Sequence, residues 1–220
     1  MKQYLSQAIL FVAALLVLAV PASAQITHTA KGDVDANAQK ILAKASSKFN
    51  ASAVSFSVTM VSKDANKKET ARQTAQVLFN KGKYRVSVAD MVLYSDGKTL
   101  WQYDKAAKEV LVNAASTADD DLLNPAGLLT NYAKSYRAKY IRTESDGTNV
   151  IDLTPKKARS YHKVRLLISE GGVLKKMELH NFDSSSSEYT VSNFKSAVKC
   201  ADSDFVFDTS TKGVEVIDMR

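Results

Sequence analysis

Short alternating segments follow one another through most of this chain with no helix between them, and this spacing limits the fold more than any other feature. Phe56, Val58 and Met60, for example, alternate with polar residues, as in a strand with one covered and one wet face. The connections are too short for parallel crossovers, so neighbouring strands should be antiparallel. We therefore predict about ten or eleven strands, at residues 52–60, 74–79, 84–89, 91–94, 99–103, 109–112, 136–144, 149–154, 161–169, 173–182 and 188–197.

Two segments have helical spacing instead. Asp35 can cap a helix whose apolar residues, from Ile41 to Phe49, recur at three- and four-residue steps. A second, strongly apolar stretch between Thr117 and Tyr132 is broken by Pro125 and Gly127 and predicts a short helix inside the β-rich run. Consecutive strands without intervening helices exclude a doubly wound α/β fold. The economical solution is a large curved sheet with helices packed on one apolar face.

The first residues have the layout of a cleavable secretory signal. Lys2 precedes an apolar run, Ala8 to Val20, which ends at the small residues Ala22-Ser23-Ala24. The run has about 13 residues, fewer than the ~20 that a membrane-spanning helix needs. We expect residues 1–24 to be the signal peptide, 25–34 a flexible mature N-terminus, and 35–220 one exported, periplasmic domain.

Charge and cysteine content narrow the class of protein. The formal net charge is +7. An exported protein without clustered Arg and interleaved aromatic residues is not expected to bind nucleic acid. A basic, solvated surface is therefore the simpler interpretation of the charge. The single cysteine, Cys200, cannot form an internal disulfide, so the domain depends on its core. We expect Cys200 to serve packing.

No pattern predicts catalysis. His28, His162 and His180 have no ligand partners at metal-binding spacing, and the Asp119–Asp121 triplet lacks the spaced oxygens of a calcium loop. There is also no phosphate-binding loop and no nucleophile elbow. We therefore expect a binding protein and not an enzyme, with no metal and no cofactor.

One segment carries a family resemblance. Residues 93–104, Leu-Tyr-Ser-Asp-Gly-Lys-Thr-Leu-Trp-Gln-Tyr-Asp, closely resemble the periplasmic outer-membrane lipoprotein carrier family, LolA, in which a strand, an Asp-Gly-Lys turn and a Leu-Trp-x-Tyr strand stand together. The opening helix with residues 52–60, the Asn-Pro-Ala-Gly-Leu-Leu run at 124–129, the strand end at 150–155 and the closing runs at 205–209 and 212–216 are also similar to that family.

The resemblance implies an unclosed antiparallel β-barrel, a half-barrel whose concave apolar face is covered by helices and accepts the acyl chains of a lipoprotein. The cavity residues it suggests are Phe56, Val58, Met60, Leu78, Trp101 and Tyr103. The corresponding lid residues are Leu122, Leu123, Pro125, Leu128 and Leu129. The family's Arg-Pro pair is replaced here by Asn80-Lys81-Gly82, so the lid latch could use Lys81 or Arg85 instead.

The expected function is therefore a carrier, a monomer that receives lipoproteins from an inner-membrane ABC-type release complex and passes them to the outer membrane, with a possible receptor there. The alternative of the same fold is a half-barrel that binds envelope lipids or senses lipoproteins; the missing Arg-Pro pair favours it. An adhesion module and a hydrolase with an unrecognised site stay open as other classes.

Overall fold

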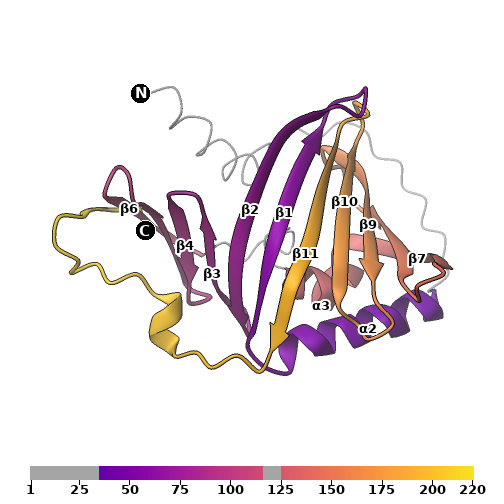
Figure 1. Cartoon of the computed structure of the whole chain (residues 1–220), viewed down its shortest axis with the longest axis horizontal. Coiled ribbons are helices and arrows are strands. Elements are labelled where there is room, and N and C mark those ends of the chain that lie inside the picture. Colours follow the sequence, from indigo (N-terminus) through magenta and orange to yellow (C-terminus); the bar gives the residue numbers. More distant parts are fainter. Residues whose placement is uncertain (1–34, 116–124) are drawn as a thin grey trace.

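The computed structural model describes residues 35–115 and 125–220 and arranges them as one large sheet with two helices (Figure 1). The expected lid residues Leu122 and Leu123, and the segments expected to form the signal and the mature N-terminus, lie outside the described residues. Neither described helix is long and apolar enough to cross a membrane. The elements are α2 (Ala36–Asn50), β1 (Val54–Lys63), β2 (Glu69–Asn80), β3 (Lys83–Val88), β4 (Met91–Ser95), β5 (Thr99–Asp104), β6 (Glu109–Ala114), α3 (Pro125–Ser135), β7 (Tyr136–Thr143), β8 (Asn149–Pro155), β9 (Tyr161–Ile168), β10 (Leu174–Asn181), β11 (Ser186–Ser196), the 3-10 turn η1 (Asp202–Phe205) and β12 (Glu215–Asp218).

The twelve described strands form a single open sheet in the order β12-β6-β5-β4-β3-β2-β1-β11-β10-β9-β8-β7. Strand β1 pairs with β2 on one side and with β11 on the other, so it joins two meanders, β2–β6 and β7–β11. Since β12 and β7 are the unpaired ends of this order, the sheet does not close. The predicted mainly β half-barrel is confirmed, with one strand more than expected, because β12 adds to β6 in parallel.

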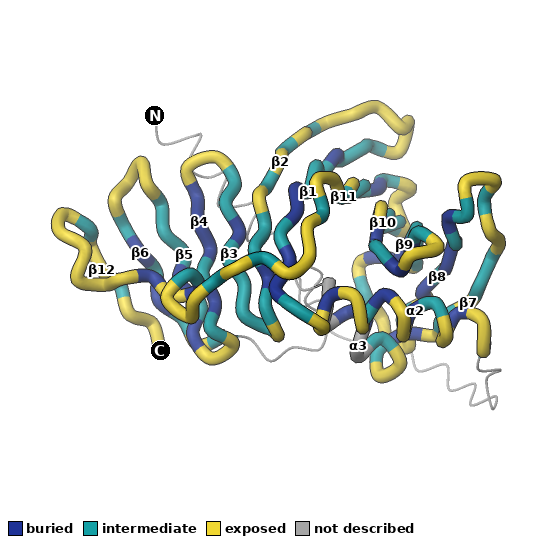
Figure 2. Tube along the Cα trace, turned by 60° about the horizontal axis from the view of Figure 1, so that its bottom comes forward, coloured by how far each residue is buried: buried dark blue, intermediate teal, exposed yellow. Residues whose placement is uncertain are grey.

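The alternation of side chains divides the sheet into two faces. Phe56 on β1 pairs with Val77 on β2, and both belong to the apolar cluster that also contains the inner residues of α2. Their neighbours Ser57 and Gln76 pair on the opposite face and hydrogen-bond at 2.9 Å between Oγ and Oε1. We call the first surface the helix face and the second the outer face. In Figure 2 the two helices lie beside the part of the sheet that contains β7–β11, and β3–β6 with β12 extend away from them.

The predicted helix begins where expected. The Asp35 carboxylate accepts from the backbone N–H of Ala38 at 3.0 Å through Oδ1 and from that of Tyr140 at 2.8 Å through Oδ2. These bonds lower the pKa of Asp35, most strongly through Ala38. One side chain thus caps α2 and fastens it to edge strand β7. At its other end, Phe49 makes edge-on contacts with Phe56 and Phe194, with centroids 5.8 and 5.6 Å apart.

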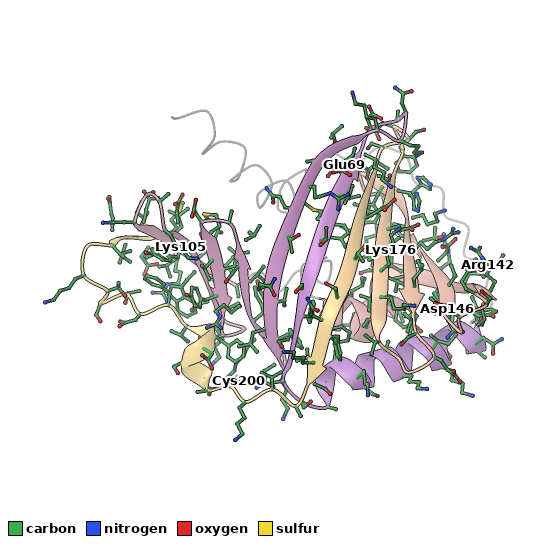
Figure 3. The ribbon with its side chains drawn as sticks, in the orientation of Figure 1. Glu69, Lys105, Arg142, Asp146, Lys176 and Cys200 are labelled. Atoms are coloured by element: carbon green, nitrogen blue, oxygen red, sulfur yellow. The ribbon has the colours of Figure 1, made fainter. Side chains whose placement is uncertain are left out.

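The outer face of β8–β11 carries paired charges. Arg165 donates to both oxygens of Asp152 at 2.7 and 2.9 Å, and Lys176 lies 2.9 Å from Glu178 and 3.1 Å from Glu188. Lys176 is labelled on β10 in Figure 3. Burial opposes the ionisation of Asp152, but the bonds and charge of Arg165 together with the charges of Lys163 and His180 outweigh it and lower the pKa of that carboxyl. This face is therefore a solvated, charge-balanced surface and not an apolar site.

The C-terminal segment covers the outer face of β3–β6. Phe207 packs on Tyr103 at 4.7 Å and on Tyr94 at 5.9 Å between ring centroids, in a second apolar cluster with Trp101, Val110 and Val112. In η1, Asp202 lies 2.7 Å from Lys83 and Asp204 lies 3.7 Å from Arg85. The segment then ends in β12. Cys200, which precedes η1, is half-buried, and its Sγ accepts from Asn80 at 3.7 Å.

Gly172, in the β9–β10 turn, lies directly against Lys44 of α2, and its replacement by alanine should destabilise the protein. Its φ is +84°, and an added Cβ would lie 3.0 Å from Cγ and 3.2 Å from the carbonyl oxygen of Lys44. The left-handed backbone costs roughly 1–2 kcal/mol, and displacing α2 should add about 1–3 kcal/mol.

Gly82→Ala is the matched control, because Gly82 has φ +88° but nothing within 4 Å of its added Cβ. Urea unfolding should show a larger loss for Gly172→Ala than for Gly82→Ala. Equal losses of stability in the two variants would mean that the contact between Gly172 and α2 does not contribute to the free energy of unfolding.

Candidate functional site

The helix face is tightly packed at the α2 end of the strands and less covered toward their other end. On β1, Val54 is fully buried and Phe56 is 3% exposed, whereas Val58 and Met60, farther from α2, are only half-buried. Strand β2 repeats the gradient, from the buried Phe79 to the half-buried Val77. An apolar surface therefore continues past the part that α2 seals.

Two further strands extend this partly covered surface. Met60 pairs with Tyr189 on β11, Tyr189 pairs with Met177 on β10, and Leu179 follows Met177 on the same face. Burial raises the pKa of the Tyr189 hydroxyl, and this effect outweighs the opposite effect of its hydrogen bond to Ser187. We use the term open apolar surface for six half-buried residues. Five belong to the helix-face cluster, and Met60 joins them through its pairing with Tyr189: Val58, Met60, Val77, Leu179, Tyr189 and Val191.

Strand β11 bends at a bulge beside this surface. The register of β1 against β11 shifts between Ser55 and Ser57, where Asn193 has a φ of +54° and donates to Ser57 Oγ at 3.2 Å. The extra residue turns Phe194 back onto the helix face, where it stacks with Phe56 at 6.2 Å. The bulge thus lets one strand contribute both to the sealed end and to the open apolar surface.

Helix α3 packs under the same face. Leu128 and Leu129 are 4% and 2% exposed and belong to the cluster formed by α2 and the sheet. At the end of α3, Ser135 accepts from the backbone N–H of Lys156 at 2.8 Å, and the Lys156 ammonium donates to the carbonyl of Ala133. The described contacts of α3 are therefore the apolar packing of Leu128 and Leu129 and hydrogen bonds at its C-terminal end.

A buried tyrosine pair lies just beyond α3. The hydroxyls of Tyr136, the first residue of β7, and Tyr161, the first residue of β9, are 2.5 Å apart. Burial and this bond raise the pKa of Tyr136 well above its usual range. Since both hydroxyls satisfy each other inside the core, the pair fixes the point where α3 leads into the sheet.

The residues that the sequence suggested for the cavity do not share one surface. Phe56, Val58 and Met60 lie on the helix face. Leu78 pairs with Arg85, Arg85 with Tyr94 and Tyr94 with Trp101, and this unbroken register places Leu78, Trp101 and Tyr103 on the outer face. There Trp101 and Tyr103 pack under the C-terminal segment. Candidate lining residues are thus limited to the first three, with Val77, Leu179, Tyr189 and Val191 added.

The expected latch also needs correction. Arg85 lies on the outer face beside Asp204, so it holds the C-terminal segment and not α3. Lys81 is an exposed turn residue with a φ of +48°. Lys156 is instead a basic side chain that bonds α3. Its position after β8 could not be linked to the helix from sequence spacing alone.

The histidines are placed on neighbouring strands. The rings of His162 on β9 and His180 on β10 lie 6.2 Å apart, and His180 Nε2 is 3.5 Å from Glu178. Burial lowers the pKa of His180, aided by the nearby Lys163. Among the residues that the structure describes, no group of three or more His, Cys, Asp or Glu could hold a metal ion.

Comparison with known proteins gives a consistent picture. The family model described as "Outer membrane lipoprotein carrier protein LolA" matches residues 47–208. An outer-membrane lipoprotein carrier protein from Vibrio cholerae is 34% identical over 132 residues, which are 59% of this chain and 63% of the relative, less than two thirds of its length. One from Haemophilus ducreyi is 29% identical over 175 residues, covering 74% of this chain and 80% of the relative.

Among solved structures, an uncharacterized conserved protein from Thermus thermophilus has the same fold, with a TM-score of 0.58 at 11% identity over 83% of this chain and 99% of the other. The family model covers most of the domain, including the helix face and α3. The chain belongs to the outer membrane lipoprotein carrier protein LolA family.

Proposed function

We propose that this protein carries lipoproteins by sheltering their acyl chains on the helix face. The observation that supports the proposal most is the gradient of burial along β1 and β2, which leaves Val58, Met60 and Val77 half-covered at the end away from α2. An apolar surface that the described residues leave partly uncovered can accept an apolar ligand.

The energetic need for such a shelter is large. Burying one CH₂ group is worth ~0.8 kcal/mol, so a chain of ~16 carbons would lose more than ~10 kcal/mol if it were left in water. Part of that gain would be spent on moving α3, whose Leu128 and Leu129 occupy the same face. The net affinity would therefore depend on how easily α3 leaves the sheet.

The proposed cellular route is supported by the family membership and by the N-terminal signal layout. In this proposal the exported monomer works in the periplasm as a binding protein without enzymatic activity. It takes lipoproteins from an inner-membrane ABC-type release complex and delivers them to the outer membrane, with or without a receptor. Its partners must supply the energy of transfer.

A second function of the same fold is the binding of free envelope lipids or the sensing of lipoproteins. It is favoured by the turn Asn80-Lys81-Gly82, which stands where the family has its Arg-Pro pair, and by the engagement of Arg85 with Asp204. Both features indicate that α3 is held differently here. The two functions differ in what occupies the helix face.

A photo-crosslinking amino acid at Met60, tested in cells, should capture acylated lipoproteins. Thr59 is the matched control, because it is the preceding residue on β1, is also half-buried, and faces outward opposite Thr74. Mass spectrometry of the captured species separates the outcomes. Capture at Met60 that falls when the cargo lacks acyl chains supports the carrier. Free lipid alone would favour the second function, and equal capture at both positions would contradict an acyl site on the helix face.

A further inference from the structure

The most exposed large hydrophobic residue in the described chain is an aromatic at the tip of the β10–β11 hairpin. Phe182 is 72% exposed. One side of its ring packs against His162 on β9, with the ring centroids 5.4 Å apart. An aromatic held in this position exposes most of its ring to whatever approaches the end of the sheet.

The turn that presents Phe182 is rigidly bonded. Asn181 donates through its backbone N–H to the carbonyl of Ser185 at 3.1 Å, and its side-chain amide donates to Ser185 Oγ at 2.9 Å. The Asp183 carboxylate accepts from the backbone N–H and the hydroxyl of Ser185. The polar side chains of the turn thus satisfy one another and leave the apolar ring outside.

This turn lies at the open end of the apolar surface. The β9–β10 turn at the opposite end touches α2, where Lys44 Nζ donates to the carbonyl of Glu170 at 2.6 Å. The β1–β2 turn is joined to the tip of β10–β11 by a bond of 2.8 Å from Lys67 Nζ to the carbonyl of Ser184. Figure 1 shows both turns together, away from α2.

Basic side chains accompany Phe182 at this end. Lys67 and Lys68 lie in the β1–β2 turn. Lys156 and Lys157 follow β8 and precede Tyr161, which pairs with Asn181 at the base of the aromatic's turn. The neighbouring acids are engaged locally: Asp64 accepts from the backbone of Asn66 and Lys68, Asp183 accepts from Ser185, and Glu69 pairs with Arg72 at 2.7 Å.

We propose that this end of the sheet docks on the surface of an anionic phospholipid bilayer, with Phe182 inserted at the level of the headgroups and the lysines of two flanking loops on the lipid phosphates. A protruding aromatic among cations from separate loops suits an interface that is apolar below and negatively charged above. A protein partner would instead favour a recessed, packed aromatic at the centre of a flat patch. The inference goes beyond cargo binding, because it concerns the bilayer to which the open apolar surface is brought.

Co-sedimentation with vesicles of phosphatidylglycerol and phosphatidylethanolamine, against vesicles of phosphatidylcholine alone, tests the proposal on the mature chain. We expect binding to the anionic vesicles that weakens with salt. Phe182→Ser should weaken it about tenfold, and Lys68→Glu with Lys157→Glu should weaken it by roughly tenfold or more. Met219→Ser is the control, since Met219 is 65% exposed beyond β12 and should leave binding unchanged.

A Phe182→Trp variant in a Trp101→Phe background adds a direct readout. Its emission should shift to the blue with anionic vesicles and be quenched by brominated lipid. Three outcomes would overturn the proposal: no vesicle binding, which leaves a protein partner; binding that Phe182→Ser does not change; and loss of binding with Met219→Ser as well. Crosslinking at Met60 is independent, so failure here leaves the carrier proposal standing.

Discussion

Replacing Leu128 and Leu129 together with serine should release α3 from the sheet while the sheet stays folded. Both side chains are almost fully buried in the helix-face cluster. Truncating a buried leucine to alanine costs about 2–5 kcal/mol, so the pair should cost at least ~4 kcal/mol. Hydrogen exchange of the α3 amides should therefore accelerate about a thousandfold, since 1.4 kcal/mol is tenfold in an equilibrium constant.

Ala133→Ser is the control for this experiment, because Ala133 is an exposed residue of the same helix. The double variant should also bind more of an environment-sensitive apolar dye, and acyl cargo should dissociate from it more slowly, since the closed competitor is weaker. If the amides of β1 and β9 lose protection as much as those of α3, the helix is an inseparable part of the core and cannot act as a lid.

Phe205→Ala should destabilise the β3–β6 part of the sheet by about 3–5 kcal/mol. Phe205 is fully buried in η1, which packs on β3 and β4, and it positions the segment that carries Phe207 over Trp101 and Tyr103. The chain has one tryptophan, so its fluorescence reports on this cluster directly. We expect a lower urea midpoint and a red-shifted Trp101 emission, because the ring becomes wetter.

Val206→Ala is the matched control, because its side chain is the next in sequence but 38% exposed. It should change the midpoint little. A Phe205→Ala protein with the original midpoint and emission would show that the C-terminal segment does not stabilise the outer face of β3–β6.

Local features were predicted well because they depend on neighbours in sequence. Asp35 caps α2 as expected, and at the turn between β4 and β5 Asp96 Oδ1 accepts from Lys98 and Thr99 while Gly97 has a φ of +89°. Alternation gave eleven of the strands. The twelfth, β12, has four residues, and its pairing partner β6 lies about a hundred residues earlier, so no local pattern identifies it.

Sequence alternation could not place the candidate lining residues on one face of the sheet, because a strand's alternation does not say which of its two faces is shared with the next strand. Leu78 and Trp101 are as apolar as Phe56, and only the register across β2, β3, β4 and β5 shows that they face outward. The outer face of β3–β6 can carry apolar side chains because the C-terminal segment covers them. Arg85 was misassigned for the same reason, since its partner Asp204 comes from that segment.

The central position of β1 also has a consequence for the order of folding. β1 can pair with β2 as soon as both strands have been synthesised, but its other partner, β11, lies more than a hundred residues later in the chain. Loop closure over such a separation is slow, and at synthesis rates of about 5–20 residues per second it must await many seconds of further chain. Until then β1 is an unpaired strand edge beside an uncovered apolar face, which is prone to aggregation. Joining β1 to β11 is therefore the late step that unites the two meanders, and the sheet is complete only when its last strands are present.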